Sequence, residues 1–255
     1  MKASVRAVLL LLITLSAAGL TARLGVWQLD RAHQKESLQA AVQAKAELEP
    51  LQTADLRALS KSPDELKRQL QRRVVLRGTW LGERTVFLDN RSMSGRTGFY
   101  VVTPLLLEGQ SGLVLVQRGW SPRDAADRSR LQNVPTPAGL VSVSGRLIAA
   151  PSKVYEFADA PVGPIRQNLD LPAYEREIGQ TIWPVTVLQT DDVQVSNQVA
   201  PDGLLRAWQA PDAGLHKHYG YAFQWFLLSA LILGLYVWFQ TIRFRKQLKS
   251  ATAAS

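Results

Sequence analysis

Residues Tyr219–Ile242 read YGYAFQWFLLSALILGLYVWFQTI and contain no charged side chain. About 20 apolar residues in a row are needed to cross the hydrocarbon core of a bilayer, and this stretch exceeds that length. Aromatic side chains lie near both of its ends, where they would meet the two membrane interfaces. The stretch predicts a transmembrane helix over residues 219–242.

A second apolar stretch lies at the start of the chain. It is uncharged from Ala7 to Ala22, and it extends to Trp27 if one arginine carries its guanidinium to the headgroups. This predicts a first transmembrane helix over residues 7–27. A cleaved signal peptide is the alternative, because the start is basic and Ser16-Ala17-Ala18 resembles a cleavage region. Apolar residues continue past that point, which favours an uncut anchor.

The net positive charge of the chain comes mostly from residues that flank these two stretches. The net charge is +9, yet all 21 Asp and Glu lie between the stretches, where most of the Lys and Arg balance them. Short basic flanks are retained on the cytoplasmic side of a membrane. We therefore expect cytoplasmic termini, including a basic tail over residues 243–255, and a periplasmic domain over residues 28–218. Its nearly balanced charge argues against a nucleic-acid partner.

The composition removes several kinds of chemistry from this domain. The chain has no cysteine, so it can build neither disulfides nor thiolate sites for copper or iron–sulfur clusters. His33, His216 and His218 all lie near the predicted membrane boundaries. The middle region thus lacks the histidines of zinc hydrolases and Ser–His–Asp enzymes, which argues against both classes of enzyme there.

The region between the spans is predicted to be β-rich. Runs of β-branched and aromatic residues alternate with turn residues such as Asp89-Asn90-Arg91 and Gly95-Arg96-Thr97-Gly98. No long helix separates successive runs, so one α+β domain with an antiparallel sheet or small barrel is favoured over a parallel α/β fold. The six expected strands cover residues 74–76, 85–88, 99–107, 113–117, 141–147 and 185–188.

Three helical segments are expected around these strands. Residues 30–49 lack Gly and Pro and should continue the first span outward as a stalk. Ser62-Pro63-Asp64-Glu65 is typical of a helix start, and that helix should end near residue 72. A short helix is expected over residues 171–178. Arg118-Gly119-Trp120, at the end of an apolar strand, either displays a cation and an indole or packs them, and packing is favoured.

His218 lies at the start of the second span, where its position on the expected helix suggests a role. If the helix begins near His218, residues 218, 221 and 225 are spaced i, i+3 and i+7 and lie on one face. A neutral imidazole there can ligate a haem iron, with Tyr221 and Trp225 beside the ring. The alternative is an interfacial histidine in an aromatic belt, and spacing by itself favours that alternative.

Several motifs resemble, in order and spacing, those of the surfeit locus protein 1 family of cytochrome c oxidase assembly factors. The resemblance runs from end to end of the chain and includes the first span's exit and the second span's entrance. The matching residues are Gly25, Trp27, Gln28, Leu29, Arg31, Lys35, Arg77-Gly78-Thr79-Trp80, Asp89-Asn90-Arg91, Gly98, Val102-Thr103-Pro104-Leu105, Gln117-Arg118-Gly119-Trp120, Pro122, Gly145-Arg146-Leu147 and His218-Tyr219-Gly220-Tyr221-Ala222-Phe223-Gln224-Trp225-Phe226.

The resemblance implies a membrane-anchored factor that binds haem a and assists its insertion into the catalytic subunit of a haem-copper oxidase. No covalent turnover is implied, so we expect a chaperone that is not an enzyme. The axial iron ligand falls on His218, whereas His216 has no such support. Tyr219 departs from the family, which more often has an aliphatic residue there; this leaves the ligand unchanged and concerns the pocket around it. The implied partners are the oxidase catalytic subunit, the lipid bilayer and a haem a synthase.

Two other functions stay open beside the haem carrier. One is a haem-free scaffold that stabilises an oxidase assembly intermediate, and it shares every motif with the carrier. The other is an exported enzyme on a two-span anchor, against which the missing histidines and cysteines weigh. We expect a bacterial inner-membrane location, because the first span begins within a few residues of Met1 and leaves no room for a transit peptide.

Overall fold

The computed structural model describes residues 3–109, 112–127, 130–151, 153, 163–208 and 214–252. The chain divides into two compact units. One consists of residues 1–41 and 210–255, and the other of residues 42–209. The first holds most of the two long helices, and the second holds all the strands of the described chain.

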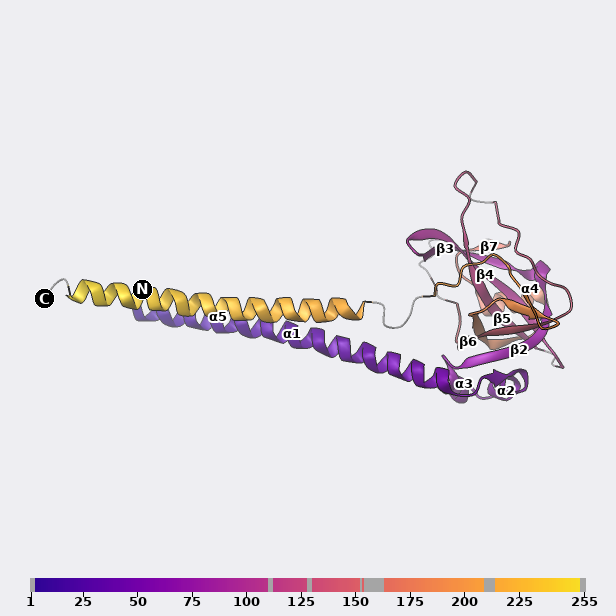
Figure 1. Cartoon of the computed structure of the whole chain (residues 1–255), viewed down its shortest axis with the longest axis horizontal. Coiled ribbons are helices and arrows are strands. Elements are labelled where there is room, and N and C mark those ends of the chain that lie inside the picture. Colours follow the sequence, from indigo (N-terminus) through magenta and orange to yellow (C-terminus); the bar gives the residue numbers. More distant parts are fainter. Residues whose placement is uncertain are drawn as a thin grey trace. The chain divides into compact units, whose positions relative to one another are not determined.

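Two long helices, α1 (Ala3–Glu47) and α5 (Leu215–Thr252), form the first unit and lie side by side (Figure 1). Both are long and apolar enough to cross a membrane. Only 11% of the most apolar stretch of each is buried within the protein, so their Leu, Phe and Val side chains point outward, as lipid-facing residues do. The expected pair of apolar helices flanking a β-rich domain is confirmed, and α1 continues without a break into the predicted stalk as far as Glu47.

The second unit is built on a five-stranded barrel. Around the ring, each strand is hydrogen-bonded to the next, and the last pairs with the first. All neighbours are antiparallel except β5 and β8, which are parallel. The order is β2 (Arg73–Trp80), β4 (Arg96–Leu107), β5 (Leu113–Pro122), β8 (Ile182–Gln189) and β6 (Leu140–Ile148). The small barrel expected from the sequence is therefore present.

The barrel closes at the end of β2, which pairs with two strands at once. Gly78 lies opposite Leu107 of β4 on one side and Val141 of β6 on the other. A Cβ atom at Gly78 would lie 2.4 Å from the backbone oxygen of Leu106. Only glycine permits this approach of the two backbones, which gives the Arg77-Gly78-Thr79-Trp80 motif a structural reason.

Alternation along the strands directs apolar side chains into the barrel. Along β2, Val74 and Leu76 are buried, and along β6, Val141 and Val143 are buried, while the residues between them are more exposed. This is the period-2 pattern of a strand with one buried face. Leu56 and Leu66, from two short helices, join the same core.

Shorter elements surround the ring. Strand β3 (Val86–Met93) forms a hairpin with β4, and β7 (Ile165–Arg166) lies beside β3. The remaining elements are β1 (Leu51–Gln52), α2 (Thr53–Leu59), α3 (Pro63–Gln69), a 3-10 turn (Gly82–Arg84), α4 (Leu171–Ile178), β9 (Val193–Val195) and β10 (Gln198–Ala200).

Helix α4 covers a second apolar cluster on the outside of the barrel. Asp170 caps its first turn by accepting a hydrogen bond from the amide of Ala173, and Gly179 ends it in the left-handed conformation, with φ of 72°. Tyr174 is buried against β3, β4 and β5, and its hydroxyl donates to the carbonyl of Arg84. The short helix expected over residues 171–178 is confirmed.

All six expected strands are present, and each is longer than predicted. Two predicted turns differ from the structure. Arg96-Thr97-Gly98 lies within β4, and Asp89-Asn90-Arg91 lies within β3, where the register shifts and Asn90 has a φ of 58°. Such a bulge uses the same left-handed conformation as a turn, which is why the residues look alike. The hairpin instead turns at Ser94 and Gly95, both with positive φ. Helix α2 and the two- and three-residue strands were not predicted.

Candidate functional site

Helices α1 and α5 pack along a repeat of seven residues. The buried positions of α1 include Ala18, Gly25 and Ala32, and those of α5 include Ala222 and Ser229. A seven-residue repeat keeps one seam of each helix facing its neighbour. Small residues at such a seam let two membrane helices approach closely.

Close approach is visible at two points of this seam. A Cβ atom on Gly25 would lie 2.8 Å from the ring of Phe226, so the phenyl ring occupies the space above the glycine backbone. The hydroxyl of Ser229 donates to the carbonyl of Ala18 over 2.9 Å, and both residues are buried. These contacts fix the antiparallel register of the two helices.

His218 lies on the same seam, in the first turns of α5. Its ring is half-buried, and Nδ1 is 2.8 Å from Oε1 of Gln28 on α1. An amide oxygen can only accept, so Nδ1 carries the proton, and in the neutral ring Nε2 keeps its lone pair. No described residue forms a hydrogen bond with Nε2. The geometry therefore presents one ring nitrogen as a donor of electrons to an external group.

The other two predicted site residues, Trp225 and Tyr221, differ in their position relative to the seam. Trp225 follows His218 by one seven-residue repeat and is half-buried on the same side of α5. Tyr221 is 51% exposed and lies off the seam. The structure thus brings His218 and Trp225 to the face toward α1, and it leaves Tyr221 beside that face. His216 is exposed.

Two further contacts involve residues close in sequence to His218 and Gln28. The hydroxyl of Tyr219 donates to Oε1 of Glu36 over 2.7 Å, which adds to the His218–Gln28 and Ser229–Ala18 hydrogen bonds between the helices. On α1, the guanidinium of Arg31 lies 5.7 Å from the ring centre of Trp27. Tyr219 therefore takes part in the pairing of the two helices through Glu36.

Gln28 was matched by the sequence motifs but was not predicted to contact His218. The sequence feature that could have indicated this contact is the seven-residue spacing of Thr21, Gln28 and Lys35, which lies beside the buried series of small residues. A polar residue on the buried seam of an apolar helix needs a partner. The sequence did not show which residue of α5 that partner is.

A second polar cluster lies in the barrel unit and contains the predicted Arg118-Gly119-Trp120 segment. Arg118 is buried in β5, where it donates to the carbonyl of Pro135 over 2.7 Å and to Oδ2 of Asp202 over 3.1 Å. Its guanidinium lies 4.9 Å from the ring centre of Trp80. Burial lowers the pKa of Arg118, against the attraction of Asp202. The expectation that these residues pack rather than project outward is confirmed.

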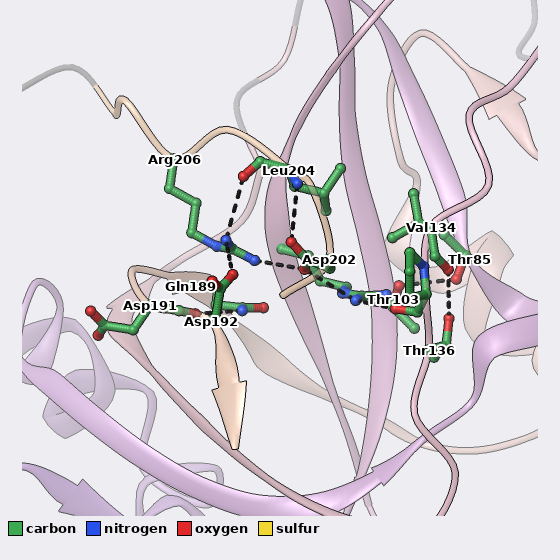
Figure 2. A network of polar contacts seen from close by, with 12 residues as sticks. Thr85, Thr103, Val134, Thr136, Gln189, Asp191, Asp192, Asp202, Leu204 and Arg206 are labelled. Atoms are coloured by element: carbon green, nitrogen blue, oxygen red, sulfur yellow. Dashed lines mark hydrogen bonds and ion pairs between the residues drawn. The ribbon is translucent and has the colours of Figure 1, made fainter. Parts of the chain in front are cut away.

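This cluster attaches residues 202–206 to the barrel. Figure 2 shows Arg206 reaching both Asp192, over 2.7 Å, and Asp202, over 2.6 Å. Backbone hydrogen bonds in both directions join Trp120 to Leu205. The cluster is a structural attachment, and its charged groups are engaged with one another.

A metal site built from protein side chains alone is not found among the described residues: no three His, Asp or Glu converge there. The single imidazole of His218 could supply an axial ligand to a metal whose other ligands come from a porphyrin.

Comparison with known proteins gives a consistent result. A sequence model of the SURF1 family matches residues 15–230. The chain is 30% identical over 116 residues to the yeast protein "Cytochrome oxidase assembly protein SHY1" of Saccharomyces cerevisiae, a match that covers 45% of this chain and 29% of the yeast protein.

Two relatives match over most of their length. A "SURF1-like protein" of Monosiga brevicollis is 25% identical, over 88% of this chain and 84% of the relative. Another, from Rickettsia bellii, is 28% identical, over 84% of this chain and 83% of the relative. Since the family model covers most of the chain, from within the first apolar helix to within the second, the chain belongs to the SURF1 family.

Proposed function

We propose that this protein is an assembly factor for haem-copper cytochrome c oxidase, that it holds haem a through His218, and that it assists insertion of the haem into the catalytic subunit. The observation that carries the proposal is the half-buried His218 at the start of an apolar helix, with Nδ1 bonded to Gln28. The name of the yeast relative supports the oxidase as the target, although the matched part spans less than a third of that protein.

The residues around His218 suit haem a as a cargo. Imidazole is a common axial ligand of haem iron, and the partner of Nδ1 leaves Nε2 for the metal. Trp225, on the same seam, and Tyr221, exposed next to it, offer aromatic surface to a flat ring. The apolar outer surface of α5 would let the hydrocarbon tail of the haem remain in lipid. His218 would hold the iron, and the aromatic residues would orient the ring.

The proposed location follows from the charges beside the helices. Residues near both termini are basic, and basic flanks stay in the cytoplasm. In this arrangement of a bacterial inner-membrane protein, the barrel is periplasmic and His218 lies near the outer bilayer surface. The barrel then docks on the oxidase, and a haem a synthase is the natural donor of the cargo. The role is that of a chaperone, with no covalent turnover.

A haem-free scaffold is the second candidate, and one observation favours it. The Gln28–His218 hydrogen bond also stabilises a helix pair without any cofactor, because a polar contact between membrane helices contributes about 0.6–2 kcal/mol. In a scaffold, His218 would serve pairing alone. The two candidates therefore differ in whether His218 binds iron.

The deciding experiment measures haem in the purified full chain. The protein is isolated from membranes that make haem a, and its visible spectrum is compared with those of His218→Ala and His216→Ala. We expect haem in the wild type and in His216→Ala, whose exposed ring is the matched control, and loss of haem in His218→Ala. A colourless wild type, or an unchanged spectrum in His218→Ala, overturns the haem site.

A parallel measurement tests the oxidase role by itself. In a host that lacks its own family member, the wild-type chain should restore assembled oxidase activity. A carrier loses this with His218→Ala, whereas a scaffold keeps most of it. Failure of the wild type to restore oxidase would contradict both candidates.

A further inference from the structure

We propose that Gln28 is a positioning residue for His218: it holds the imidazole as the Nδ1–H tautomer and so leaves Nε2 as the nitrogen that would bind a haem iron. This inference rests on the proposed function for its cofactor, but its geometric basis is independent of any cofactor. It assigns a role to a residue of the first helix in a site otherwise formed by the second.

The hydrogen bond defines the tautomer. Oε1 of Gln28 lies 2.8 Å from Nδ1 of His218, within the range of a good N–H···O bond. The amide oxygen has lone pairs and no hydrogen, so the ring must donate. A neutral imidazole has a single N–H, and placing it on Nδ1 leaves the lone pair on Nε2. Histidines that bind metals commonly show this arrangement, with the second ring nitrogen donating to a carbonyl or carboxylate.

The packing around Gln28 keeps its side chain in place. Gln28 is half-buried and lies one helical turn from Gly25 and one from Ala32, both of which are buried on the seam. Withdrawing its amide would leave two polar groups unpaired next to apolar surface, which is unfavourable. The Tyr219–Glu36 hydrogen bond, one residue beyond His218, resists rotation of α5.

The register of the helices therefore controls the orientation of the ligand. The Ser229–Ala18 contact and the Gly25–Phe226 contact lie farther along the same seam and fix how far α5 can slide along α1. A helix pair that is correctly registered places Gln28 opposite His218. The orientation and tautomer of the His218 ring therefore depend on correct pairing of the two helices.

Three variants of the full chain in detergent test this role. Gln28→Leu removes the acceptor at nearly constant volume, Gln28→Glu keeps an acceptor, and Gln39→Leu is the matched control, since Gln39 is exposed on the same helix. Substitution of the hydrogen-bond partner of a metal-binding histidine typically lowers metal affinity by about 10–100-fold. We expect haem a to bind about 10–100-fold more weakly to Gln28→Leu, and Gln28→Glu and Gln39→Leu to stay within a few-fold of wild type.

A second readout needs no haem. The ¹⁵N shifts of the His218 ring in the haem-free protein, assigned with His218→Ala, report which nitrogen carries the proton. We expect the Nδ1–H form to dominate in the wild type and the preference to be lost in Gln28→Leu. If Gln28→Leu disturbs folding, retention of the tautomer in Gln28→Glu still tests the inference.

The outcomes separate the two proposals. A wild type with the Nδ1–H form but no haem contradicts the proposed function and supports only the control of the His218 tautomer by Gln28. A wild type that binds haem, with unchanged affinity and tautomer in Gln28→Leu, overturns the positioning role alone. A bound-haem midpoint potential that falls in Gln28→Glu, where a carboxylate makes the imidazole more basic, supports it further.

Discussion

Arg118 and Asp202 form an ion pair in which both side chains are at most 1% exposed, with Nη2 3.1 Å from Oδ2. The two residues are 84 positions apart in the sequence. The pair connects β5 to the segment that precedes α5, so it ties the barrel wall to the end of the chain's central domain.

Removing one partner of this pair should be costly. Asp202→Ala leaves the Arg118 guanidinium buried without its counter-charge, and such a change costs about 3–5 kcal/mol. We expect a loss of that size in the free energy of unfolding of the full chain in detergent, measured by tryptophan fluorescence in denaturant.

The matched control for this prediction is Asp64→Ala. Asp64 is 85% exposed and lies 4.0 Å from Lys67, and exposed pairs contribute little. Its loss should change stability by less than about 0.5 kcal/mol. Equal effects of the two substitutions would show that burial of the Arg118–Asp202 pair is not what matters.

The helix seam should be sensitive to volume at Gly25. Gly25→Val places carbon atoms in the space of the Phe226 ring, and overpacking of this kind typically costs about 1–3 kcal/mol.

The chain has no cysteine, so the double substitution Ala18→Cys with Ser229→Cys reports on helix pairing without background thiols. The oxidised cross-link should form readily in membranes and decline when Gly25→Val is added. Gly19→Ala is the control, since a Cβ atom at Gly19 would have nothing within 4 Å, and cross-linking unaffected by Gly25→Val would contradict the packing.

The buried hydroxyl of Tyr174 should give a measurable dependence on pH. Burial raises the pKa of Tyr174, so the folded protein keeps this phenol neutral after the unfolded chain begins to ionise near pH 10. Stability from this group is therefore complete below about pH 10 and declines as the pH rises further. Tyr174→Phe should be about 1 kcal/mol less stable at neutral pH, because the carbonyl of Arg84 loses its donor.

Denaturant unfolding of wild type and Tyr174→Phe at pH 8 and pH 11 checks this sign. The difference between them should shrink or reverse at the higher pH. A difference that grows with pH would mean that the folded state stabilises the ionised phenol.

The expected topology can be tested by labelling. Lys61→Cys is exposed in the barrel unit, and it should react with a membrane-impermeant maleimide in cells whose outer membrane has been permeabilised. Ser255→Cys should react only after lysis, since the basic residues before it favour the cytoplasm. The reverse pattern would invert the orientation and place His218 at the cytoplasmic surface.

Features that depend on neighbouring residues were predictable. The apolar runs indicated both long helices, and the Asp170 cap and Gly179 stop are local signals that bounded α4. Strand β4 was found because its apolar run is long. In contrast, β9 and β10 have three residues each, too few for alternation to stand out.

Part of the candidate site was predictable for the same reason. His218 and Trp225 were identified from motif and helical spacing, and the structure places both on the seam. Spacing also grouped Tyr221 with them, but the axis of α1 decides which side of α5 is buried, and it leaves Tyr221 exposed. A helix face can be read from one sequence segment, whereas the side that meets a partner depends on the partner.

The sequence by itself determined the two apolar helices, the β-rich domain between them and membership of the family, because composition, periodicity and motifs are local properties of the chain. Only the tertiary structure decided that Gln28 meets His218, 190 residues away, and that β6 returns to close the barrel on β2. Such pairings depend on register between distant segments. That register is selected by packing of small residues, as at Gly25 and Gly78, and by partners for buried polar groups.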